Sequence, residues 1–103
     1  MSGIMSLTGE PEGQPQKMGV AFADIFWGLY SVIGIQAALA ERARSGLDQH
    51  MDISLLDSMT VVLANQAMNF LASGKAPTRL GNAYPNIISY QVFALADGQV
   101  IIA

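Results

Sequence analysis

The pattern of apolar and polar positions predicts helices, a strand and a hairpin, separated by loops. From Ile25 to Ala40 no residue is charged and nearly every face is apolar, which is typical of a helix buried all round or one in a membrane. We predict a helix from about Asp24 to Arg44, ended by Gly46. Because the uncharged stretch is shorter than the roughly 20 residues that cross a bilayer, we expect a buried helix and no membrane span.

Between residues 49 and 55, apolar and polar side chains alternate, which predicts a half-buried strand. The apolar positions are Met51, Ile53 and Leu55, and the polar positions are His50, Asp52 and Ser54. Ser54 and Asp57 have the spacing of a helix capping box, and apolar residues then recur every three or four positions. We therefore predict a second helix that runs to about Ala72 and ends at Gly74.

The remaining segments are predicted as loops and one hairpin. Residues 1–18 show no sustained period, and residues 73–89 are rich in Gly, Pro and Asn, so both are expected to be loop or linker. Residues 90–95 resemble a strand, Asp97-Gly98 is a turn signal, and residues 99–103 begin the return strand. Because the sequence stops inside that strand, we expect the chain to be a fragment of a larger protein.

The composition excludes several classes of protein. Of the 103 residues, 51% are hydrophobic and 13% are charged, about half the charge of an ordinary soluble domain. We therefore expect much of the apolar surface to meet another chain, a further part of the same protein or lipid. The absence of cysteine excludes disulfides and thiolate metal sites, and a net charge of −3 argues against nucleic acid as a partner.

Few polar residues are candidates for chemistry. Asp24 is a lone carboxylate at the start of an apolar helix, where it could cap the helix or serve as a nucleophile or general acid or base. His50 and Asp52 could share a hydrogen bond, although a solvent-facing pair is the simpler interpretation. One histidine without cysteine does not make a metal site, so no metal is expected.

Two further polar motifs have structural interpretations beside the functional ones. Ser54 and Asp57 are expected to cap a helix. The loop from Arg79 to Asn82, followed by Pro85-Asn86, could contact an anionic ligand or could be a turn-rich connector.

Several short motifs occur in a fixed order and cover essentially the whole chain. They are Ser2–Gly9, Ala23-Asp24 with Gly28-Leu29-Tyr30 and Gly34-Ile35, Gln49–Asp57, Arg79–Asn82 with Pro85-Asn86, Tyr90–Phe93, and Asp97-Gly98. This ordered set resembles the family III CoA-transferases, the group that includes carnitine CoA-transferase, BaiF-type bile-acid enzymes and formyl-CoA transferase. One departure is Asp48, which stands where the family commonly has glycine and is expected to strain the turn.

The resemblance implies an α/β fold, with part of a Rossmann-like large domain and the start of a smaller α+β domain. Residues 1–72 would be the C-terminal part of the first large-domain segment, residues 73–89 a linker, and residues 90–103 the first hairpin of the small domain. It also implies an interlocked homodimer of full-length chains. The absence of cysteine is compatible with a reducing cytosol, and we expect a cytoplasmic enzyme.

The implied chemistry is CoA transfer between carboxylic acids, with a CoA thioester as substrate. Asp24 matches the position of the family's nucleophile, which attacks an acyl-CoA and forms a mixed anhydride. Leu55 falls near a position that approaches CoA in some members. By this resemblance the fragment on its own is expected to be inactive, because most CoA-contacting residues match positions before Met1.

Two alternatives remain open. The acyl-CoA racemases of the same superfamily use the aspartate as an acid or base together with a histidine, which His50 does not match. A non-catalytic alternative is a membrane-associated or partner-binding α/β protein whose apolar helix forms its interface.

Overall fold

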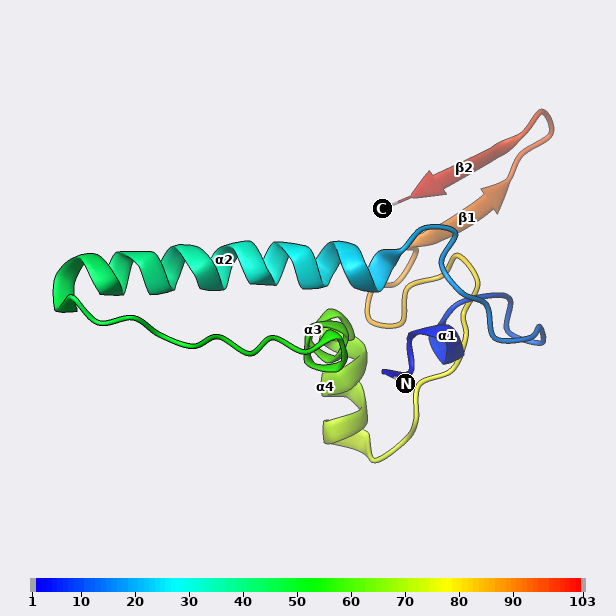
Figure 1. Ribbon diagram of the computed structural model, residues 1–103. Coiled ribbons are helices and arrows are strands. Elements are labelled where there is room, and N and C mark those ends of the chain that lie inside the picture. Colours follow the sequence, from blue (N-terminus) through cyan, green and yellow to red (C-terminus); the bar gives the residue numbers. More distant parts are fainter. Residues whose placement is uncertain (1, 103) are drawn as a thin grey trace. The chain divides into compact units, whose positions relative to one another are not determined.

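The computed structural model describes residues 2–102, and its mixture of helices and strands is consistent with the predicted α/β class. In chain order the elements are α1 (Ile4–Leu7), α2 (Phe22–Ser45), α3 (Leu55–Val62), α4 (Ala64–Ser73), β1 (Gln91–Ala94) and β2 (Gln99–Ile102), shown in Figure 1. The chain forms two compact units. One comprises Ser2 with residues 18–75, and the other comprises residues 3–17 with the described residues after Lys75. The predicted limits at residues 1 and 103 lie outside the described residues.

The long helix α2 is confirmed, and it begins slightly earlier than predicted. Its stop is as predicted, because Gly46 adopts a left-handed conformation with φ of 73° and its N–H donates to the carbonyl of Arg42 over 2.8 Å. Asp24 does not cap the helix: the N-cap residue is Ala21, which offers no side-chain acceptor, and Asp24 lies inside the first turn. The rings of Phe22 and Phe26, four positions apart, pack against each other and stabilise this earlier first turn.

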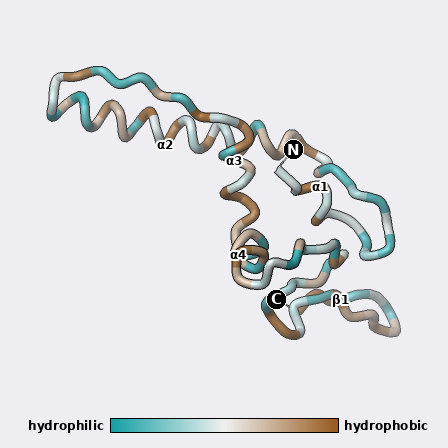
Figure 2. Tube along the Cα trace, turned by 90° about the horizontal axis from the view of Figure 1, so that it is seen from below, coloured by the Kyte–Doolittle hydropathy of each residue, from teal (hydrophilic) through white to brown (hydrophobic). Residues whose placement is uncertain are grey.

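The prediction that α2 is buried all round is wrong for the described residues, since no residue of this helix is buried. Figure 2 shows hydrophobic positions recurring along its length. The exposed ones are Ile25, Trp27, Leu29, Val32, Ile33, Ile35 and Leu39. Apolar surface of this extent is typical of contact with further protein or with lipid. Within the described residues α2 is long and apolar enough to cross a membrane, a criterion that core helices of soluble proteins also meet.

The predicted strand at residues 49–55 is wrong, although its alternation is real. The segment runs extended beside α2 in Figure 1, without a strand partner in the described part of the chain. Met51 and Ile53 are half-buried, with their terminal methyl groups against Gly34 of α2, whereas His50 and Asp52 are exposed. The alternation of apolar and polar residues therefore arises because one face of the extended segment packs on a helix. The pattern alone does not distinguish this arrangement from a strand with one face packed in a sheet.

The second predicted helix is divided into α3 and α4. The break falls at Leu63 and Ala64, where Ala64 has a φ of 45°, directly after the β-branched run Thr60–Val62. Such residues lower helix propensity, which explains why the break occurs here. The predicted end is confirmed, because Gly74 has a φ of 69° and its N–H donates to the carbonyl of Phe70 over 2.8 Å.

The core of the first unit is small and lies in α3. Among the described residues, Ser58 and Met59 are the buried ones, with 4% and 6% of their surface exposed. The hydroxyl of Ser58 donates to the carbonyl of Ser54 over 2.9 Å, which satisfies its hydrogen-bonding group within the helix. The most deeply buried part of this unit, among the described residues, is therefore the middle of α3.

The second unit contains the predicted hairpin. β1 and β2 pair antiparallel, with Gln91 opposite Ile102 and Ala94 opposite Gln99. The turn closes through the N–H of Leu95, which donates to the carbonyl of Gly98 over 2.8 Å. The predicted N-terminal loop contains one unpredicted helical turn, α1, which is too short to leave a periodic pattern.

Candidate active site

Asp24 lies in the first turn of α2, where the positive end of the helix dipole favours an anion. The rings of Phe22 and Phe26 pair across the same turn, with centroids 4.7 Å apart. Because side chains two positions away leave a helix on nearly the opposite side, the Asp24 carboxylate points away from this aromatic pair. Asp24 is exposed, and its side chain makes no hydrogen bond or ion pair within residues 2–102. The carboxylate is thus free to meet a ligand.

The N-terminus of α3 is built by the predicted capping motif. The Ser54 hydroxyl accepts a hydrogen bond from the N–H of Asp57 over 3.0 Å, which confirms the capping role predicted for this pair. Leu55 is the first residue of the helix and is 47% exposed. Its side chain is therefore available for an apolar contact at the start of α3.

A hollow of about 240 Å³ lies between α2 and the start of α3. Its lining consists of Tyr30, Asp52, Ile53, Ser54, Asp57, Ser58 and Val61. Among these lining residues, Tyr30 belongs to α2. The part of α2 around Tyr30 therefore lies opposite the capping motif. The hollow confirms that α2 and the start of α3 face each other.

A hydrogen bond that the sequence does not reveal joins the same two elements. The indole N–H of Trp27, one turn after Asp24, donates to the main-chain carbonyl of Ile53 over 2.6 Å. Its position in the apolar pattern does not separate Trp27 from the other apolar residues of α2. Two signals could have indicated it: it is the single tryptophan of the sequence, with an indole N–H donor, and it lies one turn from Asp24.

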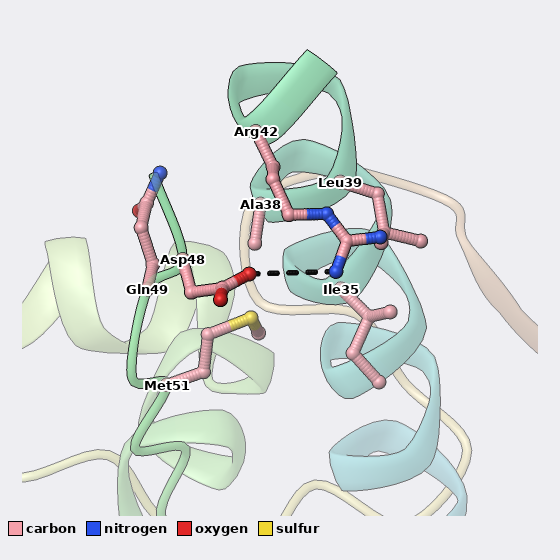
Figure 3. Close-up of a pocket in the computed structure, with 7 residues that line it drawn as sticks. All are labelled: Ile35, Ala38, Leu39, Arg42, Asp48, Gln49 and Met51. Carbon is pink, nitrogen blue, oxygen red and sulfur yellow. Dashed lines mark hydrogen bonds and ion pairs between the residues drawn. The ribbon is translucent and has the colours of Figure 1, made fainter. Parts of the chain in front are cut away.

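Asp48 does not strain the turn, contrary to expectation. The left-handed position is taken by Gly46, and Asp48 is not among the non-glycine residues with positive φ. The Asp48 carboxylate pairs with Arg42 over 3.4 Å, beside a hollow of about 220 Å³ shown in Figure 3. Both side chains are largely exposed, so this ion pair contributes little stability.

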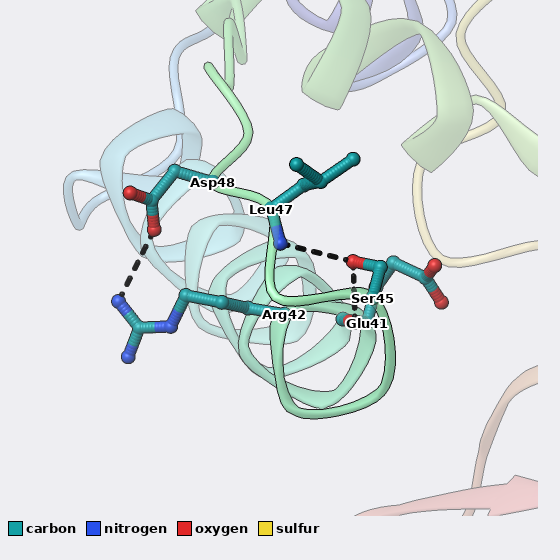
Figure 4. A network of polar contacts seen from close by, with 5 residues as sticks. All are labelled: Glu41, Arg42, Ser45, Leu47 and Asp48. Atoms are coloured by element: carbon teal, nitrogen blue, oxygen red, sulfur yellow. Dashed lines mark hydrogen bonds and ion pairs between the residues drawn. The ribbon is translucent and has the colours of Figure 1, made fainter.

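The C-terminus of α2 is closed by polar contacts shown in Figure 4. The Ser45 hydroxyl donates to the carbonyl of Glu41 over 2.9 Å and accepts from the N–H of Leu47 over 3.2 Å. These bonds satisfy main-chain groups at the helix end and fix the direction in which the chain leaves it.

The other candidate residues have no visible catalytic arrangement. His50 and Asp52 are both exposed, and the structure joins them by no hydrogen bond within the described part of the chain. The described residues also contain no group of three or more His, Cys, Asp or Glu placed to hold a metal ion.

Arg79 is engaged in structure. Its Nε donates to the carbonyl of Glu10 over 3.2 Å, and its Nη2 faces the carbonyl of Pro11 at 3.4 Å. The N–H of Gly81 donates to the carbonyl of Gly9 over 3.0 Å, so the loop after Arg79 is tied to residues 9–11. The geometry therefore supports the connector interpretation of this loop.

The sequence profile described as "CoA-transferase family III" matches residues 1–103. The chain belongs to CoA-transferase family III. The succinate–glutarate CoA-transferase of Agrobacterium fabrum is 62% identical over 103 residues, which are 100% of this chain and 26% of that protein. The succinyl-CoA:mesaconate CoA-transferase of Haloarcula hispanica is 36% identical over the same length, again with 100% and 26% coverage.

A solved structure of this family has the same fold. The crystal structure of a CaiB/BaiF family protein from Brucella suis is 66% identical and superposes with a TM-score of 0.85. The match covers 99% of this chain and 27% of that one. This family III chain therefore spans about a quarter of the length of the relatives it matches. The relatives from Agrobacterium fabrum and Haloarcula hispanica are both named CoA-transferases, so the racemase alternative is not favoured.

Proposed function

We propose that the full-length protein carrying this segment is a CoA-transferase that moves CoA between dicarboxylic acids of the succinate and glutarate class. The observation that carries the proposal is the 62% identity to a succinate–glutarate CoA-transferase over the whole chain. The position of Asp24 supports it, since an exposed carboxylate at a helix N-terminus, with no side-chain partner among residues 2–102, suits an attacking anion.

In the proposed mechanism, one carboxylate oxygen of Asp24 attacks the thioester carbon of the donor acyl-CoA. The C–S bond breaks, CoA leaves as the thiolate, and a mixed anhydride remains on Asp24. The thiolate then attacks the aspartyl carbonyl, which releases the donor acid and leaves an aspartyl-CoA thioester. The acceptor carboxylate attacks this thioester, its C–S bond breaks, and a second mixed anhydride and free CoA thiolate form. The thiolate then attacks the acceptor's carbonyl carbon, so that the acceptor leaves as its acyl-CoA and the Asp24 carboxylate is restored.

Further parts of the proposal concern the surroundings of Asp24. Leu55 offers an exposed apolar side chain at the start of α3, which would pack against the CoA thioester. The exposed apolar face of α2 would be covered by the rest of a Rossmann-like large domain and by the second chain of an interlocked homodimer. The hairpin would begin the small domain.

We place the enzyme in the cytoplasm, with no metal and no membrane span. We expect the 103-residue segment alone to be inactive.

Isotope transfer tests the mechanism directly. Purified full-length protein is incubated with succinyl-CoA and glutarate labelled with ¹⁸O in both carboxylates, and the peptide containing Asp24 is analysed by mass spectrometry. The mechanism requires one labelled oxygen to remain on Asp24 after a complete turnover. Rapid CoA transfer without label on Asp24 would refute the aspartyl intermediate.

A parallel incubation in deuterated water tests the racemase alternative. A 2-methylacyl-CoA is supplied as substrate, and deuterium at its α-carbon is measured by mass spectrometry. We expect no incorporation above the rate without enzyme. Incorporation without CoA transfer would favour the racemase.

A further inference from the structure

The contacts between α2 and the extended segment after it follow an antiparallel order. Trp27 bonds to the carbonyl of Ile53, Gly34 receives the side chain of Met51, and Arg42 pairs with Asp48. As the residue number rises along α2, the number of the contacted residue falls. The segment is thus held along the helix at three places and delivers the chain to α3.

The lengths explain why this segment is extended. The helix rises about 22 Å between Trp27 and Arg42 at about 1.5 Å per residue. The chain from Asp48 to Ile53 spans at most about 18 Å at about 3.6 Å per residue. The long side chains of Trp27 and Arg42 cover the difference, and the Trp27 bond to Ile53 is the one of the three contacts nearest to α3.

The same order relates Trp27 to the candidate site residues. Asp24 lies three positions before Trp27 on α2, and residues with this spacing lie on the same face of a helix. On the partner segment, Ile53 is followed directly by the cap Ser54 and then by Leu55. The indole bond therefore joins the turn after Asp24 to the residues immediately before Leu55.

We propose that Trp27 is a positioning residue: through the hydrogen bond from its indole N–H to the carbonyl of Ile53, it sets the start of α3, with Leu55, relative to Asp24 on α2. The inference rests on the proposed function, because it assigns Asp24 to the attack and Leu55 to the CoA thioester. A neutral hydrogen bond at a residue that is 42% exposed adds little to global stability. A shift of about 1 Å between a nucleophile and its substrate, however, lowers a rate by up to about 100-fold.

The test uses Trp27→Phe in the full-length protein, since phenylalanine keeps an aromatic ring and removes the N–H donor. We expect kcat for CoA transfer from succinyl-CoA to glutarate to fall about 10- to 100-fold, with KM for glutarate changed less than about twofold. Trp27→His restores a ring N–H and should recover part of the lost kcat. Arg42→Met is the matched control, because it removes a contact of the same segment at its other end, and its kcat should stay within about twofold of the wild type.

Each outcome bears on the proposal. A wild-type kcat in Trp27→Phe overturns it, as does a Trp27→His variant that is folded yet no faster than Trp27→Phe. Equal losses in Trp27→Phe and Arg42→Met, each with a lower melting temperature, would make Trp27 a structural residue, as would failure of both Trp27 variants to fold. Asp24→Asn is measured in parallel. Full activity of Asp24→Asn refutes the proposed nucleophile, whereas an inactive Asp24→Asn beside an unchanged Trp27→Phe refutes the positioning role alone.

Discussion

The guanidinium Nε of Arg79 lies 3.2 Å from the carbonyl oxygen of Glu10, a residue 69 positions earlier in the chain. With the N–H of Gly81 bonded to the carbonyl of Gly9, this contact ties the loop after α4 to the N-terminal residues. In both bonds the acceptor is a main-chain carbonyl oxygen. The interaction therefore depends on the shape of the two loops and on the reach of one arginine.

Replacing Arg79 by methionine should loosen this junction. We expect hydrogen exchange at the N–H of Gly81 to become about tenfold faster, since a hydrogen bond of this kind contributes roughly 1–1.5 kcal/mol to local opening. Exchange measured by mass spectrometry on the full-length protein checks this. The Gly46 N–H at the end of α2 is the internal control, and equal acceleration there would show global rather than local loosening.

Replacing Asp24 by asparagine should abolish CoA transfer. Asparagine keeps the size of the side chain but lacks the anionic oxygen that attacks the thioester, so we expect kcat to fall at least about 1,000-fold. The assay is CoA transfer from succinyl-CoA to glutarate by the full-length protein. Asp97→Asn is the matched control, because that carboxylate is also exposed, lies in the turn between β1 and β2, and should be dispensable. Activity of Asp24→Asn near that of the control would contradict the assignment.

Replacing Ser54 by alanine should destabilise the start of α3. The Ser54 hydroxyl accepts the Asp57 N–H, and loss of such a cap costs about 1 kcal/mol of unfolding free energy. Denaturant unfolding of the full-length protein measures the change, and Ser54→Asp should retain most of the stability because aspartate also caps. A Ser54→Ala protein as stable as the wild type would show that the cap is energetically unimportant.

Replacing Gly34 by leucine should separate α2 from the extended segment. The Met51 and Ile53 methyl groups already occupy the space in which any added side chain would lie. Overpacking of this kind costs about 1–3 kcal/mol, and denaturant unfolding of the full-length protein measures it. Gly34→Ala should cost much less, because the terminal methyl group of Met51 can move aside. Equal stability of the leucine variant and the wild type would contradict the observed close approach.

Local signals were sufficient to predict much of the fold. The helix stops at Gly46 and Gly74, the cap at Ser54 and the turn at Asp97-Gly98 all depend on residues near one another in the chain. Backbone conformation and hydrogen bonding within one turn determine such features, so they could be predicted without knowledge of the neighbours in space.

Features that depend on distant neighbours were predicted wrongly. Met51 and Ile53 alternate with polar residues, but their apolar face packs on α2 rather than within a sheet. Periodicity reports which side chains are covered and leaves open what covers them. The missed break at Ala64 has a local cause instead, because it follows the β-branched run Thr60–Val62 within an otherwise helical apolar period.

For the candidate site, the sequence by itself determined the family, through an ordered set of motifs, and it brought Asp24 forward as the nucleophile proposed above. Only the tertiary structure decided that Asp24 lies inside the first turn of α2 and that Trp27 bonds to Ile53 across 26 residues. The physical reason is that the order of the motifs is a property of the sequence alone. A contact between distant residues, in contrast, exists only after a helix and an extended segment have packed together.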